Sequence, residues 1–266
     1  MVQIIPGTAL ITGASSGIGA VYADRLAARG HDLVLVARDE HRLGALATRL
    51  RTRHGRSVDI LAADLNDPAD LARVEARLRD DPALAMLVNN AGVGSASVLL
   101  NSDVEAMDRM IRLNVLALTR LTYAAVPGFV ARGGGTLVNI GSIVAVSPET
   151  LNGVYGGTKA FVLAFSQSLR HELSEAGVRV QAVLPGATAT GFWDAAGVPV
   201  GHLPKEIVMS AEDMVDAALA GLDAGEFVTI PPLPDVAQWE AYEAARQAMR
   251  GNLSRTEPAA RYGRAA

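Results

Sequence analysis

Short apolar runs alternate with longer amphipathic segments along most of this 266-residue chain. The short runs are rich in valine, isoleucine and leucine at successive positions, which is typical of parallel strands buried on both faces. We expect strands at residues 8–12, 32–36, 57–61, 85–88, 135–140, 178–184 and 227–230. The longer segments have the length of helices, and we expect helices at residues 18–29, 39–54, 68–79, 102–126, 154–176 and 235–249.

Strands that alternate with helices predict right-handed crossovers and a parallel sheet covered on both faces. The expected fold class is therefore α/β, a Rossmann-type doubly wound sheet, whose ligands bind beyond the carboxyl ends of the strands. One domain is expected over residues 1–250, followed by a polar tail at residues 251–266. Residues 186–209 interrupt the alternation with small residues and prolines. We interpret them as a lid over a substrate, with a plain surface connection as the alternative.

The composition excludes several classes of function. Half of the residues are apolar and a fifth are charged, as in an ordinary globular protein, and the net charge of −4 gives no basic field for nucleic acid or an anionic membrane. The absence of cysteine excludes disulfides and thiolate metal sites, and the five histidines have no metal-ligand spacing, so no metal is expected. Residues 1–12 do not resemble a secretory signal, and no uninterrupted apolar run approaches about 18 residues, so we expect a cytoplasmic protein.

Three glycines follow the first expected strand and open the first expected helix. A helix amino terminus presents unpaired N–H groups and positive partial charge, and glycine lets the backbone approach a phosphate closely. The spacing is GxxxGxG rather than the more familiar GxGxxG, and a tight turn without a ligand is the alternative. We predict a turn that binds a dinucleotide pyrophosphate, made by Gly13, Ser15, Ser16, Gly17, Ile18 and Gly19.

The end of the second strand should meet the adenosine ribose of that dinucleotide. An acidic residue there favours NAD, whereas an arginine can pair with the 2′-phosphate of NADP. This chain has Ala37 followed by Arg38, with Asp39 one place later. The sequence therefore favours NADP over NAD, and the alternative is a surface ion pair of Arg38 with Asp39 or Glu40.

Ser142, Tyr155 and Lys159 form the second chemical signal. Residues four apart share a helix face, so the Lys159 ammonium is expected beside the Tyr155 hydroxyl, where it would favour the phenolate and lower a pKa that is ordinarily near 10. Ser142 ends the preceding strand and can hydrogen-bond a substrate oxygen near Tyr155. A Tyr-x-x-x-Lys pair alone is usually structural, but with Ser142 and the glycine turn it indicates proton transfer at a carbonyl or alcohol oxygen.

In order and spacing these motifs resemble the short-chain dehydrogenase/reductase family, in its shorter single-domain form, from Thr8 to about Thr190. The resemblance adds Asn114 to Ser142, Tyr155 and Lys159 as a catalytic tetrad. It implies that Lys159 also contacts the nicotinamide ribose and that Asn114 holds a water. It further implies cofactor contacts by Asp64, Leu65, Asn90, Ala91, Gly92, Pro185, Gly186, Thr188 and Thr190.

The resemblance also implies a substrate pocket and an activity. The pocket would be lined by uncharged residues, namely Val144, Ala145, Leu151, Phe192 and Trp193. The implied reaction is hydride transfer between NADP(H) and a small to medium, largely apolar ketone, aldehyde or secondary alcohol. The chain departs from the family at Gly156 and Gly157, where alanine and serine are usual, which could loosen Tyr155 or admit a closer neighbour.

Two other functions share these motifs. A nucleotide-binding regulator without catalysis typically loses the tyrosine or lysine that this chain retains, and a sugar epimerase or dehydratase is usually longer. An NAD-preferring dehydrogenase of the same fold remains an alternative. The helices beginning near residues 102 and 154 carry apolar residues on more than one face, so we expect a homodimer or homotetramer.

Overall fold

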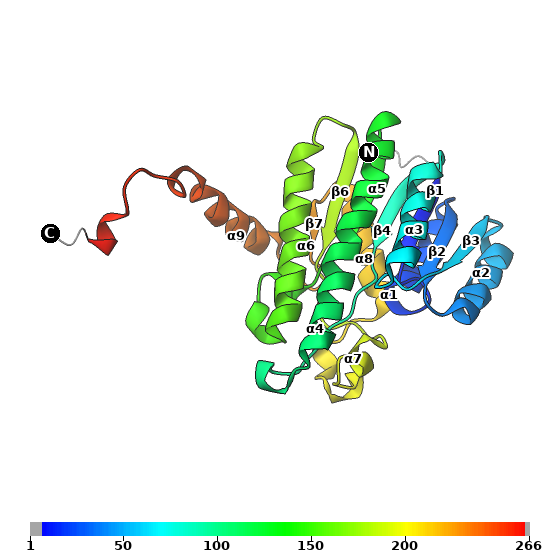
Figure 1. Ribbon diagram of the computed structural model, residues 1–266, viewed down its shortest axis with the longest axis horizontal. Helices are drawn as coiled ribbons and strands as arrows, with labels where there is room; N and C mark the ends of the chain where they lie inside the picture. Colours follow the sequence, from blue (N-terminus) through cyan, green and yellow to red (C-terminus); the bar gives the residue numbers. More distant parts are fainter. Residues whose placement is uncertain (1–6, 264–266) are drawn as a thin grey trace. The chain divides into compact units, whose positions relative to one another are not determined.

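The computed structural model describes residues 7–263, and within them a seven-stranded, entirely parallel sheet forms the centre of the fold (Figure 1). Contacts divide the chain into two compact units, Met1–Pro231 and Pro232–Ala266, which are described separately. The sheet belongs to the first unit. Its strands are β1 (Thr8–Thr12), β2 (Asp32–Ala37), β3 (Val58–Ala62), β4 (Leu84–Asn89), β5 (Gly135–Ile140), β6 (Val178–Val183) and β7 (Val228–Thr229).

The strand order is β3-β2-β1-β4-β5-β6-β7, so the chain reverses its direction of travel across the sheet between β1 and β4. Both neighbours of β1 are parallel to it: Thr12 pairs with Val36 on β2, and Ile11 pairs with Val88 on β4. In a doubly wound sheet the crevice that receives a ligand opens at such a reversal, beyond the carboxyl ends of the strands. The predicted fold class is confirmed, and the reversal places the candidate site above β1 and β4.

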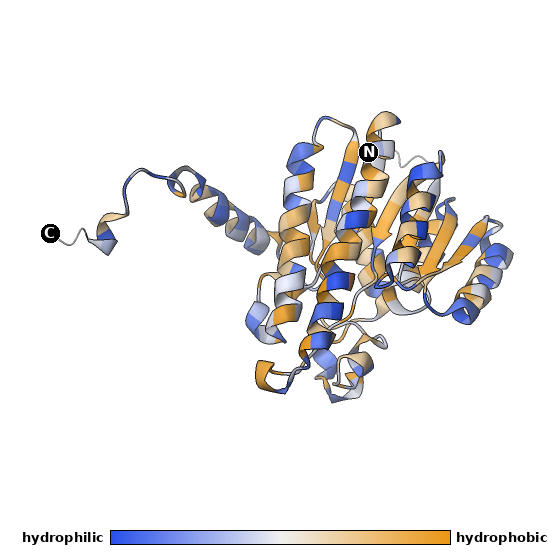
Figure 2. Cartoon of the chain, viewed as in Figure 1, coloured by the Kyte–Doolittle hydropathy of each residue, from blue (hydrophilic) through white to orange (hydrophobic). Residues whose placement is uncertain are grey.

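Helices cover both faces of the sheet because successive strand residues point to opposite sides. On β2, Leu33 and Leu35 pack in one core with α1 (Gly17–Ala28), α2 (Glu40–His54) and α8 (Ala211–Ala224). Val34 and Val36 pack in the other core with α3 (Pro68–Asp80), α5 (Leu118–Ala131) and α6 (Gly153–Glu172). The strands are accordingly among the most hydrophobic parts of the chain, and the outer faces of the helices are mixed (Figure 2).

The helix expected at residues 102–126 is present as one helical run, Val104–Ala131, but it contains a π-helical turn that was not expected. It begins as α4 (Val104–Ile111), widens into a π-helical turn at Arg112–Ala117, and continues as α5. By length and composition alone the run Val104–Ala131 could span a membrane, a test that the core helix of a soluble protein also passes. In the fold, α5 buries Leu121 and Phe129 against the sheet.

The expected lid contains one short helix, α7 (Phe192–Ala195), and two short 3₁₀ turns. Its ends are held together, because the Met209 N–H donates to the Ala187 carbonyl at 2.9 Å and the Ala189 N–H donates to the Met209 carbonyl at 2.8 Å. Residues 190–208 therefore form a loop beyond the carboxyl end of the sheet, and hydrogen bonds hold the two ends of this loop together.

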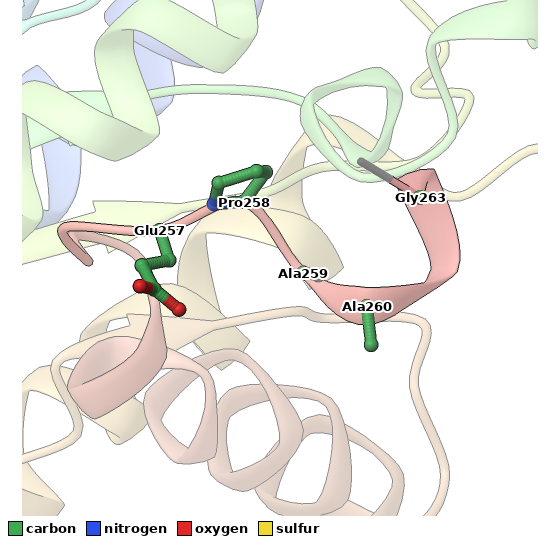
Figure 3. A pocket seen from close by; sticks show the side chains of 5 residues that line it. All are labelled: Glu257, Pro258, Ala259, Ala260 and Gly263. Atoms are coloured by element: carbon green, nitrogen blue, oxygen red, sulfur yellow. The ribbon is translucent and has the colours of Figure 1, made fainter. Parts of the chain in front are cut away.

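The second unit consists of α9 (Val236–Ala248) and a succession of turns. Trp239 and Tyr242 stack on this helix with ring centroids 5.4 Å apart. Figure 3 shows a hollow in this unit, lined by Glu257, Pro258, Ala259, Ala260 and Gly263. None of the residues predicted for the site lines it. The expected boundary at residue 250 stays a prediction.

Candidate active site

The glycine turn lies at the carboxyl end of β1 and begins α1. Gly13 and Gly17 have φ angles of 65° and 53°, a region that favours glycine. A Cβ on Gly19 would lie 2.4 Å from the Gly13 carbonyl oxygen, so the turn can close only with glycine there. The N-cap residue, Ser16, makes no side-chain cap hydrogen bond, and the first turn of α1 has no acidic residue. The turn therefore presents helix N–H groups to an anion, which is the requirement of a pyrophosphate.

Hydrogen bonds from the segment after β4 fix this turn. The Asn90 side-chain amide donates to the Thr12 carbonyl at 2.9 Å and to the Gly13 carbonyl at 3.3 Å. The Thr12 hydroxyl accepts from the backbone N–H groups of Asn90 and Ala91, each at 3.0 Å. The structure thus gives the Asn90 side chain a role in shaping the turn.

The segment after β6 lies against the same turn. A Cβ on Gly17 would be 3.0 Å from Cγ2 of Thr190. The Pro185 carbonyl accepts from the Ile143 N–H at 3.0 Å, and the Thr188 hydroxyl donates to the Gly186 carbonyl at 3.2 Å. The four residues predicted here therefore lie between the glycine turn and the turn that follows Ser142.

The residues predicted near the adenine differ in their surroundings: one lies in a turn and two pack in the core. Asp64 follows β3, and its carboxylate accepts from the Asn66 N–H at 2.9 Å in a local turn. Leu65 is buried in the core beside α3. Ile18 packs partly against the core on the other face of the sheet. The leucine and isoleucine side chains are thus engaged in packing, which leaves their backbones and Asp64 for a ligand.

Arg38 is exposed directly after β2, and none of the ion pairs found among residues 7–263 includes it. Asp39 is the N-cap of α2: its carboxylate accepts from the Arg42 N–H at 2.9 Å and pairs with the Arg42 guanidinium at 3.1 Å. The alternative in which Asp39 or Glu40 pairs with Arg38 is not what the structure shows. The Arg38 guanidinium is therefore available to bind a phosphate, because the neighbouring carboxylate of Asp39 caps α2 and pairs with Arg42.

Asn114 lies in the middle of the π-helical turn, and its amide links three segments. Its Oδ1 accepts from the Val93 N–H at 3.0 Å, and its Nδ2 donates to the Val93 carbonyl at 2.8 Å and to the Thr158 hydroxyl at 3.1 Å. Such π turns are frequent at functional sites because they re-aim one side chain within a helix. Here the turn directs Asn114 towards Gly92, whose Cβ, if present, would lie 3.1 Å from Asn114 Oδ1 and 3.6 Å from Lys159 Nζ.

Ser142, Tyr155 and Lys159 meet above the carboxyl end of β5. Asn152 caps α6 by accepting from the N–H groups of Val154 and Tyr155, which sets the first turn of the helix. Lys159 Nζ donates to the Ile140 carbonyl at 2.9 Å and lies 5.9 Å from the centroid of the Tyr155 ring. All three side chains are buried.

Burial shifts the pKa values of both Tyr155 and Lys159. It raises the pKa of Tyr155 to about 12, against the lowering effect of a hydrogen bond with Ser142. It also lowers the pKa of Lys159 to about 8. The expected lowering of the Tyr155 pKa by Lys159 is not found: burial is the largest effect on the phenol, and the Lys159 amine donates to the Ile140 carbonyl. The phenol is protonated at neutral pH, as a proton donor to a carbonyl oxygen must be.

An apolar cluster surrounds Tyr155. Met110, Val144 and Tyr155 are its buried members, and the residues packed against them are Val93, Met107, Leu151, Val154 and Phe192. Of the predicted pocket residues, Val144, Leu151 and Phe192 belong to this cluster. Ala145 ends the 3₁₀ turn Ile143–Ala145, and Trp193 donates from its indole N–H to the Thr188 carbonyl at 3.0 Å.

Sequence reasoning missed several residues that the structure brings to the site. Thr158 lies between Tyr155 and Lys159 in the sequence, and its hydroxyl donates to the Tyr155 carbonyl at 2.8 Å while accepting from Asn114. Met107 and Met110 reach the site from α4, and Gly94 lies against Phe192. No prediction was made for Met107 or Met110, and nothing in the sequence distinguished Gly94 from the other glycines.

The departure at Gly156 and Gly157 now has a physical account at one position. A Cβ on Gly156 would lie 3.1–3.2 Å from atoms of Pro148, including its backbone, so the expectation of a closer neighbour holds there. A Cβ on Gly157 would meet nothing within 4 Å. The close approach seats α6 against the 3₁₀ turn Pro148–Thr150 beside the site.

Comparisons with known proteins agree with this geometry. A family model described as short chain dehydrogenase matches residues 7–197. The chain is similar to a short-chain dehydrogenase from Sphingobium yanoikuyae in complex with NADPH, at 53% identity and a TM-score of 0.93, covering 96% of this chain and 98% of that one. It is also similar to a bulky-bulky ketone specific alcohol dehydrogenase from Comamonas testosteroni, at 45% identity and a TM-score of 0.90, covering 98% and 100% of the two chains.

Among curated proteins, the sulfoacetaldehyde reductase of Chromohalobacter salexigens is 40% identical over 187 residues, which cover 68% of this chain and 72% of that protein. The fold, the motifs in their places and these matches identify the class: the chain belongs to the short-chain dehydrogenase/reductase family. It is an NAD(P)-dependent oxidoreductase that acts on carbonyl and hydroxyl groups.

Proposed function

We propose that the protein transfers a hydride between NADP(H) and a largely apolar ketone, aldehyde or secondary alcohol. The observation that carries the proposal is a protonated phenol, Tyr155, buried in an apolar cluster beside Ser142 and next to a glycine turn that fits a pyrophosphate. Two similar solved structures support the cofactor and the substrate class of this proposal: one contains NADPH, and the other is a ketone-specific alcohol dehydrogenase.

The residues at hand fit the cofactor. The glycine turn offers free helix N–H groups, Arg38 is left for a 2′-phosphate, and the small side chain of Ala37 provides no carboxylate to repel it. When bound, NADPH supplies the hydride. Lys159, beside Gly92, is placed to hold the nicotinamide ribose.

The chain's own groups orient the carbonyl and supply the proton. Ser142 hydrogen-bonds the carbonyl oxygen, and Tyr155 donates its phenolic proton to that oxygen as negative charge develops on it. Asn114 holds the segment at Val93 and, through Thr158, the first turns of α6, so that Ser142 and Tyr155 face the same oxygen.

The pocket supports an apolar substrate, because Val144, Leu151 and Phe192 carry no charge. An apolar pocket rejects isosteres weakly, so a range of ketones is expected rather than one charged metabolite. Since one relative is specific for ketones with two bulky substituents, the screen should extend to such compounds. Oxidation of NADPH or NADH, followed by the nicotinamide absorbance across a series of ketones, tests the proposal, and no turnover with any of them would contradict it.

We also propose that the protein is a homodimer or homotetramer and is cytoplasmic. Support for association comes from large apolar side chains exposed along α4, the π-helical turn, α5 and α6, which are Val104, Ile111, Leu116, Tyr123, Val130 and Phe161.

A further inference from the structure

The ring of Phe192 covers one side of Tyr155. The two ring centroids are 5.7 Å apart at an interplanar angle of 44°, and Phe192 packs against the buried cluster around Tyr155. Trp193 meets the Phe192 ring edge-on at 5.5 Å. Phe192 is thus a lid residue that packs against the ring of the proton donor, and a substituent of a bound ketone would have to lie beside the Phe192 ring.

Gly94 provides the surface on which this ring rests. A Cβ at position 94 would lie 2.3 Å from Cζ and 2.8 Å from Cε2 of Phe192, which is closer than any real contact. Gly94 is not among the glycines with positive φ in the described part of the chain, so its backbone would accept alanine. Glycine is required here because of the ring.

Backbone contacts hold the ring and its support together. The Ala96 N–H donates to the Ala196 carbonyl at 3.2 Å, which ties the segment after β4 to the end of α7. The Phe192 N–H donates to the Thr190 hydroxyl at 3.3 Å, and the Trp193 indole donates to the Thr188 carbonyl. Phe192 is therefore anchored from both sides, and its position depends on the space left at residue 94.

We propose that Phe192, lying against Gly94, determines how large a substituent fits beside Tyr155, and that Gly94 and Phe192 act as one specificity-determining pair. This inference rests on the proposed ketone reduction. Both residues act on substrate size and neither takes part in proton transfer.

The test compares kcat/KM for a small ketone, butanone, with that for benzophenone, whose two substituents are phenyl rings. Phe192→Ala removes the ring and should raise the benzophenone-to-butanone ratio by about tenfold or more, the range of selectivity that one or two pocket carbons can provide. Gly94→Ala displaces the ring and should change the ratio by about threefold or more. In the Phe192→Ala background the same Gly94→Ala change should alter the ratio less than about twofold, because no ring is left to displace.

Gly191→Ala is the matched control, since Gly191 adjoins Phe192 but has nothing within 4 Å of a built Cβ, and it should leave the ratio unchanged. If Gly94→Ala unfolds the protein, adding Phe192→Ala should restore the thermal midpoint, because the clash of the new Cβ with the ring is then removed. Such a rescue would also show that the two residues act as a pair. Independent, additive effects of the two substitutions, or an unchanged ratio in Phe192→Ala, would overturn the inference while leaving ketone reduction intact. A wild type without activity on any ketone would overturn the proposed function and this inference with it.

Discussion

At the scale of single residues, burial holds Tyr155 and Lys159 towards their neutral forms. The pKa of the phenol rises to about 12 and that of the amine falls to about 8. The residue types and their i, i+4 spacing could be predicted from the sequence. The direction of the tyrosine shift could not, because it depends on the side chains of α4 and of the lid that pack around the ring. Sequence spacing reports neighbours on one helix and says nothing of such burial.

Lys159→Met should stabilise the protein at neutral pH. The folded-state pKa of about 8 lies below the ordinary value of 10.5, so the folded protein bears the cost of a buried charge below pH 8 and loses that cost as the pH rises towards 10.5. The variant should gain up to about 3 kcal/mol near neutral pH and about half of that or less at about pH 9.5. Urea unfolding at the two pH values measures the difference.

Lys205→Met is the control, because Lys205 is exposed and its removal should change stability little at either pH. NADPH binding should weaken in Lys159→Met but not in Lys205→Met, since only Lys159 lies beside Gly92. Equal stabilisation of Lys159→Met at both pH values would show that the stabilisation does not come from removing the buried charge of Lys159.

Arg38→Ala should weaken NADPH binding by about tenfold to a hundredfold and leave NADH nearly unaffected. The 2′-phosphate is the chemical difference between the two cofactors, and charge-assisted hydrogen bonds to it are worth about 1.5–3 kcal/mol each before solvent screening. Raised salt should erode the wild-type preference. Titration calorimetry with both cofactors measures the effect, with exposed Arg49→Ala on α2 as the control. If the wild type binds NADH as tightly as NADPH, the assignment of Arg38 fails.

At the scale of elements, the alternation of apolar runs was enough to place every strand of the sheet within two residues at each end. The helix expected at residues 102–126 lies at Val104–Ala131, but the π-helical turn inside it was not expected. The π-helical turn inserts a residue without changing the apolar pattern, because Leu113 and Ala117 still face the sheet. A pattern of hydrophobicity cannot report such a local change of pitch. The turn matters because it aims Asn114 at the site.

Thr158→Val should lower kcat by about tenfold and destabilise the fold by about 1–2 kcal/mol. The substitution keeps the shape of the side chain but removes a buried hydroxyl that joins Asn114 to the first turn of α6. Thr158→Ser retains the hydroxyl and should restore most of kcat. Steady-state kinetics with urea unfolding of both variants measures the two effects. Equal kcat in Thr158→Val and wild type would show that the link between these elements does not position the catalytic groups.

At the scale of the whole molecule, the doubly wound sheet could be predicted because its order follows from right-handed crossovers and buried parallel strands. The glycine turn, Asn114 and the serine, tyrosine and lysine converge because the carboxyl ends of β1, β4 and β5 lie next to one another in the sheet. The division of the chain at Pro231 and Pro232 was not predicted. A helix was expected at residues 235–249, and α9 lies there with none of its side chains buried.

We expect a dimer or tetramer in light scattering at micromolar concentration. Tyr123 is 70% exposed on α5 and Leu116 is 46% exposed in the π-helical turn, values that are high for large apolar side chains outside an interface. Tyr123→Glu combined with Leu116→Glu should lower the measured mass, because a charge buried between subunits is costly. Ile207→Glu, an exposed apolar position outside these helices, is the control and should leave the mass unchanged. A monomer mass for the wild type would contradict the expectation.

The central claim, that Tyr155 delivers the proton in an NADPH-dependent carbonyl reduction, is tested most directly by Tyr155→Phe. The substitution keeps the ring that packs on Phe192 and removes only the hydroxyl. Single-turnover oxidation of enzyme-bound NADPH by a ketone that the wild type reduces should slow by about 10²- to 10⁴-fold, while NADPH affinity stays within about twofold. Reduction in the variant at a rate near that of the wild type, with NADPH bound equally well, would contradict the account.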